Sequence, residues 1–264
     1  MKISVRGVSV WGPGLAGWAQ AQACLQGRAE WVDQAQIPPP AAALAPNERR
    51  RSGPVTRLAM AVAEEACALA GVKPSGLSVV FASANGDGGV IDGILKALSE
   101  PGGEVSPTQF HNSVHNAPAG YWTIGHGSIA SATALGCYDW SFGLGLLKAV
   151  SEAVVEQHPV LFVAYDQPIP GPVGTVRVTK ASFACALVLD PDLSQQAMVQ
   201  LTLCYDPQST ERADMPAHDG LRALAMGNPA ARSLSLLTCL AQSRNGSVKV
   251  ACQPGQLKIE VSPC

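Results

Sequence analysis

Charged residues are scarce in this chain of 264 residues, at 14% against 47% hydrophobic residues. The formal net charge is −2 and there is no basic block, so the electrostatic signature of a nucleic-acid-binding protein is missing. Amphipathic stretches rich in Lys and Arg, which bind membrane surfaces, are missing as well. The excess of apolar residues predicts a large buried core and an apolar surface for a partner protein.

Long apolar runs are also missing, because none approaches the roughly 20 residues that a membrane-spanning helix needs. The segment Met1–Pro13 lacks the basic start and the long apolar run of a signal peptide, and it alternates like a strand. We therefore predict a cytoplasmic protein.

Eight cysteines are present, but no two of them form a C-x-x-C pair. Cys67 and Cys185 lie inside apolar runs, which is typical of small buried side chains in a reducing compartment. A zinc site would need clustered Cys and His. We predict no metal and no cofactor.

Apolar segments that alternate between strand and helix patterns dominate the chain. Val55–Ala70 has helical spacing and stops at Gly71. Leu77–Ala84, Val160–Tyr165 and Ala181–Leu189 are apolar nearly throughout, which predicts strands buried on both faces. The fold class is therefore α/β, a sheet covered by helices on both faces. Further predicted elements are the strands Ile3–Trp11, Ser128–Thr133, Met198–Cys204, Val248–Cys252 and Leu257–Val261 and the helices Trp18–Leu25, Val90–Leu98, Tyr138–Gln157 and Arg232–Gln242.

Three further segments predict loops and turns. Gln36–Asn47 is rich in proline and too short to separate two folds. The run Arg49–Arg51 is expected in a solvated loop. The glycine-rich segment 85–89 follows a predicted strand and could cradle phosphate, but it lacks both G-x-G-x-x-G and a P-loop lysine, so a tight strand-to-helix turn is favoured.

Five segments, in chain order, resemble the N-terminal half of the β-ketoacyl-acyl-carrier-protein synthases. They are VRGVSVWGPG at Val5–Gly14, LSVVFASANGDGG at Leu77–Gly89, VSPTQFHNSVHNAPAGYWTI at Val105–Ile124, SIASATALG at Ser128–Gly136 and FACALVLD at Phe183–Asp190. The resemblance covers about Lys2 to Asp190. It implies a truncated thiolase-like fold with a mixed five-stranded-type sheet. Residues 1–264 would form one domain, in which 191–264 are remnants of the C-terminal half.

The resemblance also implies that the catalytic cysteine is missing. The family carries its nucleophile in an Ala-Thr-Ala-Cys sequence on a strained strand-to-helix turn, and here the same register reads Ala132-Thr133-Ala134-Leu135. A leucine side chain has no lone pair and cannot form an acyl-thioester. The family's His-Gly-Thr, Asn-x-x-Gly-His and Gly-Phe-Gly motifs are absent too. We therefore predict a subunit that is not an enzyme.

Two alternatives concern nearby side chains. Cys137 lies two residues past Leu135, and two helical residues differ by about 200°, so its thiol should point away from the nucleophile position. A minimal acyltransferase that uses Cys137 nevertheless stays open. His111 and His115 are four residues apart and could share a helix face, but a metal site would need a third ligand. Hydrogen bonding at a subunit interface is favoured for these histidines.

Dimers of the resembled family form by pairing the strand before the catalytic turn, which here is Ser128–Thr133. The segment Phe110–Trp122 resembles the chain-length-factor-type subunits of bacterial aryl polyene gene clusters. The resemblance implies a heterodimer, or a larger assembly, with an active ketosynthase, and transient contact with acyl-carrier protein, in polyene or polyketide biosynthesis. A homodimer and a separate module that binds acyl-carrier protein remain open. The residues expected at the partner interface and its acyl tunnel are Val105, Thr108, Gln109, Phe110, His111, Asn112, His115, Asn116, Ser128, Ile129, Ala130 and Ser131.

Overall fold

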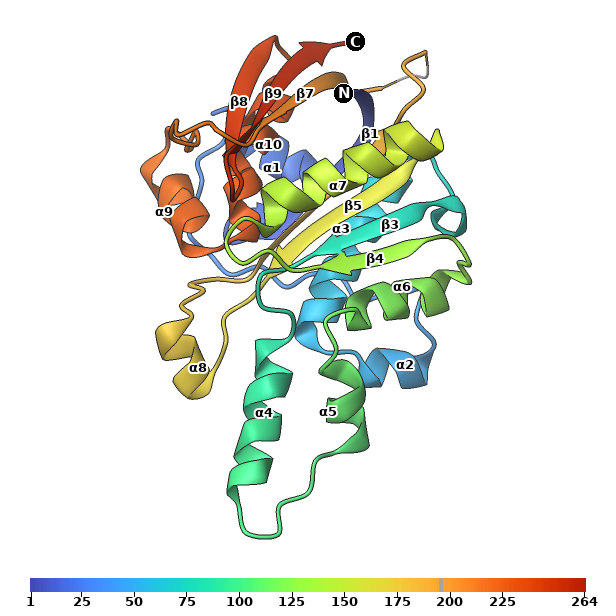
Figure 1. The fold of residues 1–264 in the computed structure, drawn as a ribbon, viewed down its shortest axis with the longest axis vertical. Helices are drawn as coiled ribbons and strands as arrows, with labels where there is room; N and C mark the ends of the chain where they lie inside the picture. The colour runs from blue at the N-terminus through green and yellow to red at the C-terminus, as the bar shows by residue number, and fades with distance from the viewer. Residues whose placement is uncertain (195–196) are drawn as a thin grey trace.

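The computed structural model describes residues 1–194 and 197–264 as a large mixed sheet with helices around it (Figure 1). Its strands are β1 (Lys2–Gly12), β2 (Leu15–Ala16), β3 (Ser78–Ala82), β4 (Ala132–Leu135), β5 (Val160–Asp166), β6 (Phe183–Asp190), β7 (Val199–Asp206), β8 (Gly246–Ala251) and β9 (Gln256–Pro263). Its helices are α1 (Trp18–Leu25), α2 (Pro46–Arg51), α3 (Pro54–Ala70), α4 (Gly88–Ser99), α5 (Pro107–Asn112), α6 (Ala117–His126), α7 (Ser141–Glu156), α8 (Gly171–Val176), α9 (Asp219–Gly227) and α10 (Leu234–Gln242), with 3₁₀ turns η1 (Pro74–Gly76) and η2 (Ala230–Ser233).

The strands of the described ranges follow the order β4-β3-β5-β6-β1-β7-β9-β8, and β2 pairs with β1. β3 is parallel to β4 and β5, whereas β6 is antiparallel to both β5 and β1. The predicted mixed sheet is confirmed, but its predicted five-strand size is too small. β7, β9 and β8 continue the same sheet beyond β1, because β1 offers an edge to which β7 pairs, and the sheet has nine strands among the described residues.

Helices cover both faces of the sheet, as predicted (Figure 1). On one face α7, α1 and α10 pack with the strands into the larger apolar core. On the other face α3 and α6 form the second core. β5 and β6 are buried along their whole length because each contributes alternate side chains to the two cores, which explains why their sequences are apolar almost throughout.

Several predicted boundaries need correction. The strand predicted at 128–133 runs instead over Ala132–Leu135, because β4 pairs residue by residue with Val79–Ala82 of β3 and can begin only where that partner strand lies. The helix predicted from Tyr138 begins at Ser141, since Tyr138 has a φ of 52° that no helix accepts. Arg49–Arg51 end the short helix α2 rather than lying in a loop.

The prediction that the cysteines are buried holds in part. All eight are free, and Cys24, Cys67, Cys185 and Cys252 are buried, but Cys204 and Cys264 are exposed. None of the helices in the described ranges combines the length and the apolar character needed to cross a lipid bilayer.

Candidate functional site

The turn between β4 and α7 occupies the place where the family resemblance predicts a nucleophile. β4 ends at Leu135 and α7 begins at Ser141, so residues 136–140 form the turn. The Ser141 hydroxyl accepts a hydrogen bond from the backbone N–H of Cys137 at 2.9 Å and donates one to the carbonyl of Tyr138 at 2.7 Å. These two bonds tie the turn to the first residue of α7.

Neither end of this turn carries a nucleophilic side chain. Leu135 is half-buried and packs against the larger core, and Trp140 is the residue directly before α7. Cys137 lies in the turn and not in a helix, so the helical geometry from which the orientation of its thiol was predicted does not apply. A different reason disfavours it: burial raises the pKa of the Cys137 thiol, so less of the reactive thiolate is present.

An ion network holds the same turn. The Asp139 carboxylate pairs with Arg177 at 2.5 Å and with Arg232 at 3.2 Å. The Arg177 guanidinium also lies 3.8 Å from the centroid of the Tyr138 ring and donates a hydrogen bond to Asn85 at 2.9 Å. Asp139 does not cap α7, although it lies close to the start of that helix, because both of its carboxylate oxygens are engaged by arginines.

A buried carboxyl group lies beside this network, where β3 and β5 end. Asp166 Oδ1 accepts hydrogen bonds from the Ser83 hydroxyl at 2.9 Å and from the N–H groups of Ala84 at 2.9 Å and Asn85 at 3.2 Å. Oδ2 has no hydrogen-bond partner in the described residues. Burial raises the pKa of Asp166 to about 7, which is consistent with a carboxyl group that keeps its proton well above its ordinary range.

We expect Asp166→Asn to remove a pH dependence of stability. Because the pKa of Asp166 is raised in the folded state, its protonation stabilises the fold fully below about pH 4, and this contribution is lost as the pH rises through about 7. The unfolding free energy of the wild type, relative to the variant, should fall by about 2–4 kcal/mol across that interval. Urea unfolding of both proteins at several pH values measures it, and a constant difference would contradict the assignment.

The glycine-rich segment after β3 forms the tight turn that the sequence favoured. The Asp87 side chain accepts a hydrogen bond at 3.1 Å from the N–H of Val90 in the first turn of α4. The Asp87 side chain thus satisfies a backbone N–H group at the start of α4.

His111 and His115 do not share a helix face, so the possibility suggested by their four-residue spacing is wrong. His111 is exposed on α5, where its ring stands edge-on to Tyr121 at 6.0 Å between centroids. His115 lies beyond the end of α5, and its Nε2 is 3.0 Å from the carbonyl oxygen of Ser83. No group of three or more His, Cys, Asp or Glu side chains in the described ranges is arranged to hold a metal ion.

The residues expected at the partner interface fall into two separate groups. Residues 105–116 lie on and around α5, which extends from the body with α4 (Figure 1). Residues 128–131 form the loop that leads into β4, where Ile129 is fully exposed. Asn112 points inward instead, because it donates to the carbonyl of Arg51 at 2.7 Å and accepts from the Tyr121 hydroxyl at 3.0 Å.

An apolar groove of about 380 Å³ lies between α5 and α6. Phe110 lines it and is 71% exposed, which leaves a large aromatic ring in solvent. Val114 and Ile124 line the groove too and are more than half exposed, although the sequence alone did not single them out. Their apolar character was visible, but only the packing of α6 against α5 shows that they share a surface with Phe110.

Solved ketosynthase structures share this architecture over almost the whole chain. The ketosynthase ApeO in complex with its chain length factor ApeC from Xenorhabdus doucetiae matches with a TM-score of 0.72 and 21% identity, over 98% of this chain and 99% of that one. The ishigamide ketosynthase/chain length factor matches with a TM-score of 0.70 and 14% identity, over 98% of both chains. The AntDE:AntF complex, a type II PKS acyl-carrier protein with its ketosynthase, gives 0.76 and 12%, over 100% of this chain and 99% of that one.

The architecture is therefore the thiolase-like ketosynthase fold, as predicted. The chain belongs to the family described as "Beta-ketoacyl synthase, N-terminal domain", whose sequence profile matches residues 17–251. A search of curated proteins gives no significant match.

Proposed function

We propose that this chain is a non-catalytic chain-length factor, which pairs with an active ketosynthase and shapes the acyl tunnel of that partner. The observation that carries the proposal is the turn after β4. It presents Leu135 and Trp140 at its two ends and holds Asp139 between two arginines, and burial raises the pKa of its one thiol, that of Cys137. The carbon–carbon bond would be formed on the partner's cysteine.

The fold relatives support the pairing. Two of them are ketosynthases solved together with a chain length factor, and a third is a ketosynthase with an acyl-carrier protein. The exposed edge of β4 would receive the partner's strand, and acyl-carrier protein would bind transiently. In this proposal residues 1–264 are one domain, with 191–264 as remnants of a C-terminal half, and the site of action in polyene or polyketide biosynthesis is the cytoplasm.

Chain length would be set by steric exclusion. Phe110 and Thr108 are exposed on α5, and Gln109 and Val105 are half-buried beside them. If these side chains close the end of the partner's tunnel, an extra methylene that has no room costs about 1–3 kcal/mol. That cost is large enough to stop elongation at one length.

Reconstitution with the cognate ketosynthase tests the function. Size-exclusion chromatography should give a heterodimer, and only the pair should condense acyl and malonyl thioesters. Condensation by the isolated chain, with an adduct at Cys137 in intact-protein mass spectrometry, would instead favour the acyltransferase. Copurification with acyl-carrier protein but not with the ketosynthase would favour a separate carrier-binding module, and a stable dimer of this chain alone would favour the homodimer.

Phe110→Ala in the reconstituted pair is expected to lengthen the product by at least one extension cycle, because the truncated side chain leaves room at the tunnel end. Mass spectrometry of the released product measures this. The matched control is Leu69→Ala, which truncates another half-exposed apolar side chain, on α3, and should leave the product unchanged. An unaltered product from the Phe110 variant would remove this residue from the mechanism.

A further inference from the structure

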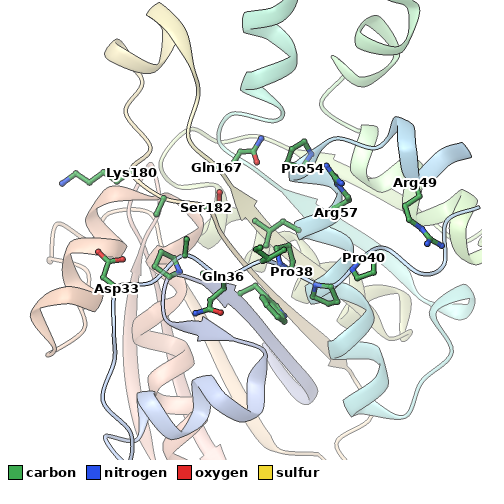
Figure 2. A pocket seen from close by; sticks show the side chains of 18 residues that line it. Asp33, Gln36, Pro38, Pro40, Arg49, Pro54, Arg57, Gln167, Lys180 and Ser182 are labelled. Carbon is green, nitrogen blue, oxygen red and sulfur yellow. The ribbon is translucent and has the colours of Figure 1, made fainter. Parts of the chain in front are cut away.

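A second cavity, of about 710 Å³, lies beneath the proline-rich segment that precedes α2 (Figure 2). Residues 35–40 of that segment form one wall, and the end of β1, the start of α3 and the residues before β6 form the others. None of the residues assigned to the partner interface or its tunnel lines this cavity. The cavity is therefore separate from the proposed chain-length site. An inference about what it binds does not rest on the proposed function.

The wall of this cavity is held in place at both of its ends. The N–H of Gly14 donates a hydrogen bond at 2.8 Å to the carbonyl of Gln34, and Ala41 and Leu44 are fully buried beyond the other end. Between these anchors, Pro38–Pro40 restrict the backbone because each ring fixes its own φ. A wall held in this way does not have to be ordered by a ligand, which lowers the entropic cost of binding.

Most of the cavity lining is apolar. Trp11, Pro13, Pro38 and Leu58 contribute rings and aliphatic surface, and their side chains come from three separate segments. The volume falls within the range of about 300–1,000 Å³ that is typical of sites for small organic molecules. The lining and the size therefore fit an apolar organic group.

One positive charge at the rim is uncompensated. Arg57, on α3, lines the cavity, and no described residue forms an ion pair or hydrogen bond with its side chain. Its neighbours at helical spacing are Gly53, Pro54, Met60 and Ala61, none of which is acidic. An unpaired guanidinium beside an apolar cavity attracts an anionic group, and its planar fork matches a carboxylate with two parallel hydrogen bonds.

The other charged side chains at the rim are Arg49, Asp33 and Lys180. Arg49 donates to the carbonyls of Ala42 and Leu44, and its charge helps to lower the pKa of Glu64 against the effect of burial. Figure 2 shows Asp33 and Lys180 together on the side opposite the two arginines. The carboxylate of Asp33 disfavours a second negative group at that end.

We propose that this cavity binds a monocarboxylate with a linear apolar chain, whose head group pairs with Arg57 while its chain lies along Trp11 and the proline wall. The probe is decanoate, titrated into the purified chain by isothermal titration calorimetry. Binding with one site per chain is expected, and the neutral analogue 1-decanol should bind about tenfold more weakly because it cannot pair with the guanidinium. Butyrate should not bind measurably, since it buries too little apolar surface.

Two variants test the two parts of the site independently. Arg57→Gln should weaken decanoate binding by about tenfold and leave 1-decanol unchanged. Arg212→Gln, at another exposed arginine that forms no ion pair with a described residue, should change neither. Ser182→Trp should abolish binding of both by filling the cavity from its exposed rim. Thermal unfolding confirms that each variant is folded. Absence of decanoate binding to the wild type, or binding that neither cavity variant alters, overturns the proposal.

Discussion

Ala132→Pro is expected to prevent assembly with the ketosynthase while the chain itself stays folded. The carbonyls of Ser131 and Leu135 accept hydrogen bonds from the N–H groups of Val79 and Ser83 on the β3 side. Because such bonds alternate along a strand, the N–H of Ala132 points to the outer edge of the sheet, where no strand of the described residues pairs with it. A proline there leaves the internal ladder intact and removes a donor that the partner strand needs.

The expected loss of affinity is large. Proline removes an inter-chain hydrogen bond and places its ring where the partner's backbone would lie, a combined cost of about 3 kcal/mol or about a hundredfold in affinity. Size-exclusion chromatography of the coexpressed pair measures it. Ala132→Ser is the matched control, because it retains the backbone donor at the same exposed position and should assemble normally. Assembly of the proline variant at wild-type affinity would show that the partner does not pair with this edge.

Trp122→Ala is expected to destabilise the protein by about 3–5 kcal/mol. Trp122 is fully buried between α6 and the sheet, with its ring centroid 6.3 Å from that of Phe81 and 4.1 Å from that of His126. The cavity left by alanine cannot be refilled without moving α6, which also forms the groove beside Phe110. Urea unfolding measures the loss, and the pair with the ketosynthase should weaken as well.

Trp122→Phe separates packing from polar effects at this position. The indole N–H of Trp122 has no hydrogen-bond partner in the described residues, so phenylalanine gives up no bond and even removes a buried unsatisfied donor. We therefore expect a cost of only about 1 kcal/mol. Equal unfolding midpoints for the alanine and phenylalanine variants would show that the ring does not hold α6 on the sheet.

The secondary structure could be predicted from the sequence wherever the residues of one short segment are enough to determine it. β5 and β6 are apolar along their length because both faces are buried, and Gly71 ends α3 with a φ of 64°. The strand before the turn begins four residues later than predicted, at Ala132 instead of Ser128. The run SIASATAL has strand character throughout, and only the extent of β3 decides which part of it pairs.

The candidate site was predicted less completely. That β4 ends on a leucine and not on a cysteine could be read from the residues around Leu135, without knowing their neighbours in space. The role of Asp139 could not, because its partners Arg177 and Arg232 follow it by tens of residues and no local pattern links them. Likewise, the outward or inward direction of Asn112 depends on Arg51 and Tyr121, which lie on other helices.

The sequence by itself determined that this chain has an α/β core and that the strand before the turn ends on Leu135 instead of a cysteine, since both depend on the chemistry of consecutive side chains. Only the tertiary structure decided that β4 forms an edge of the sheet and that Arg177 and Arg232 both pair with the Asp139 carboxylate. The tertiary structure alone also placed Arg57, which has no side-chain partner among the described residues, beside a cavity with a proline wall. The physical reason is that strand order and charge pairing depend on contacts between residues far apart in the chain. The energies of such contacts cannot be read from a local sequence pattern.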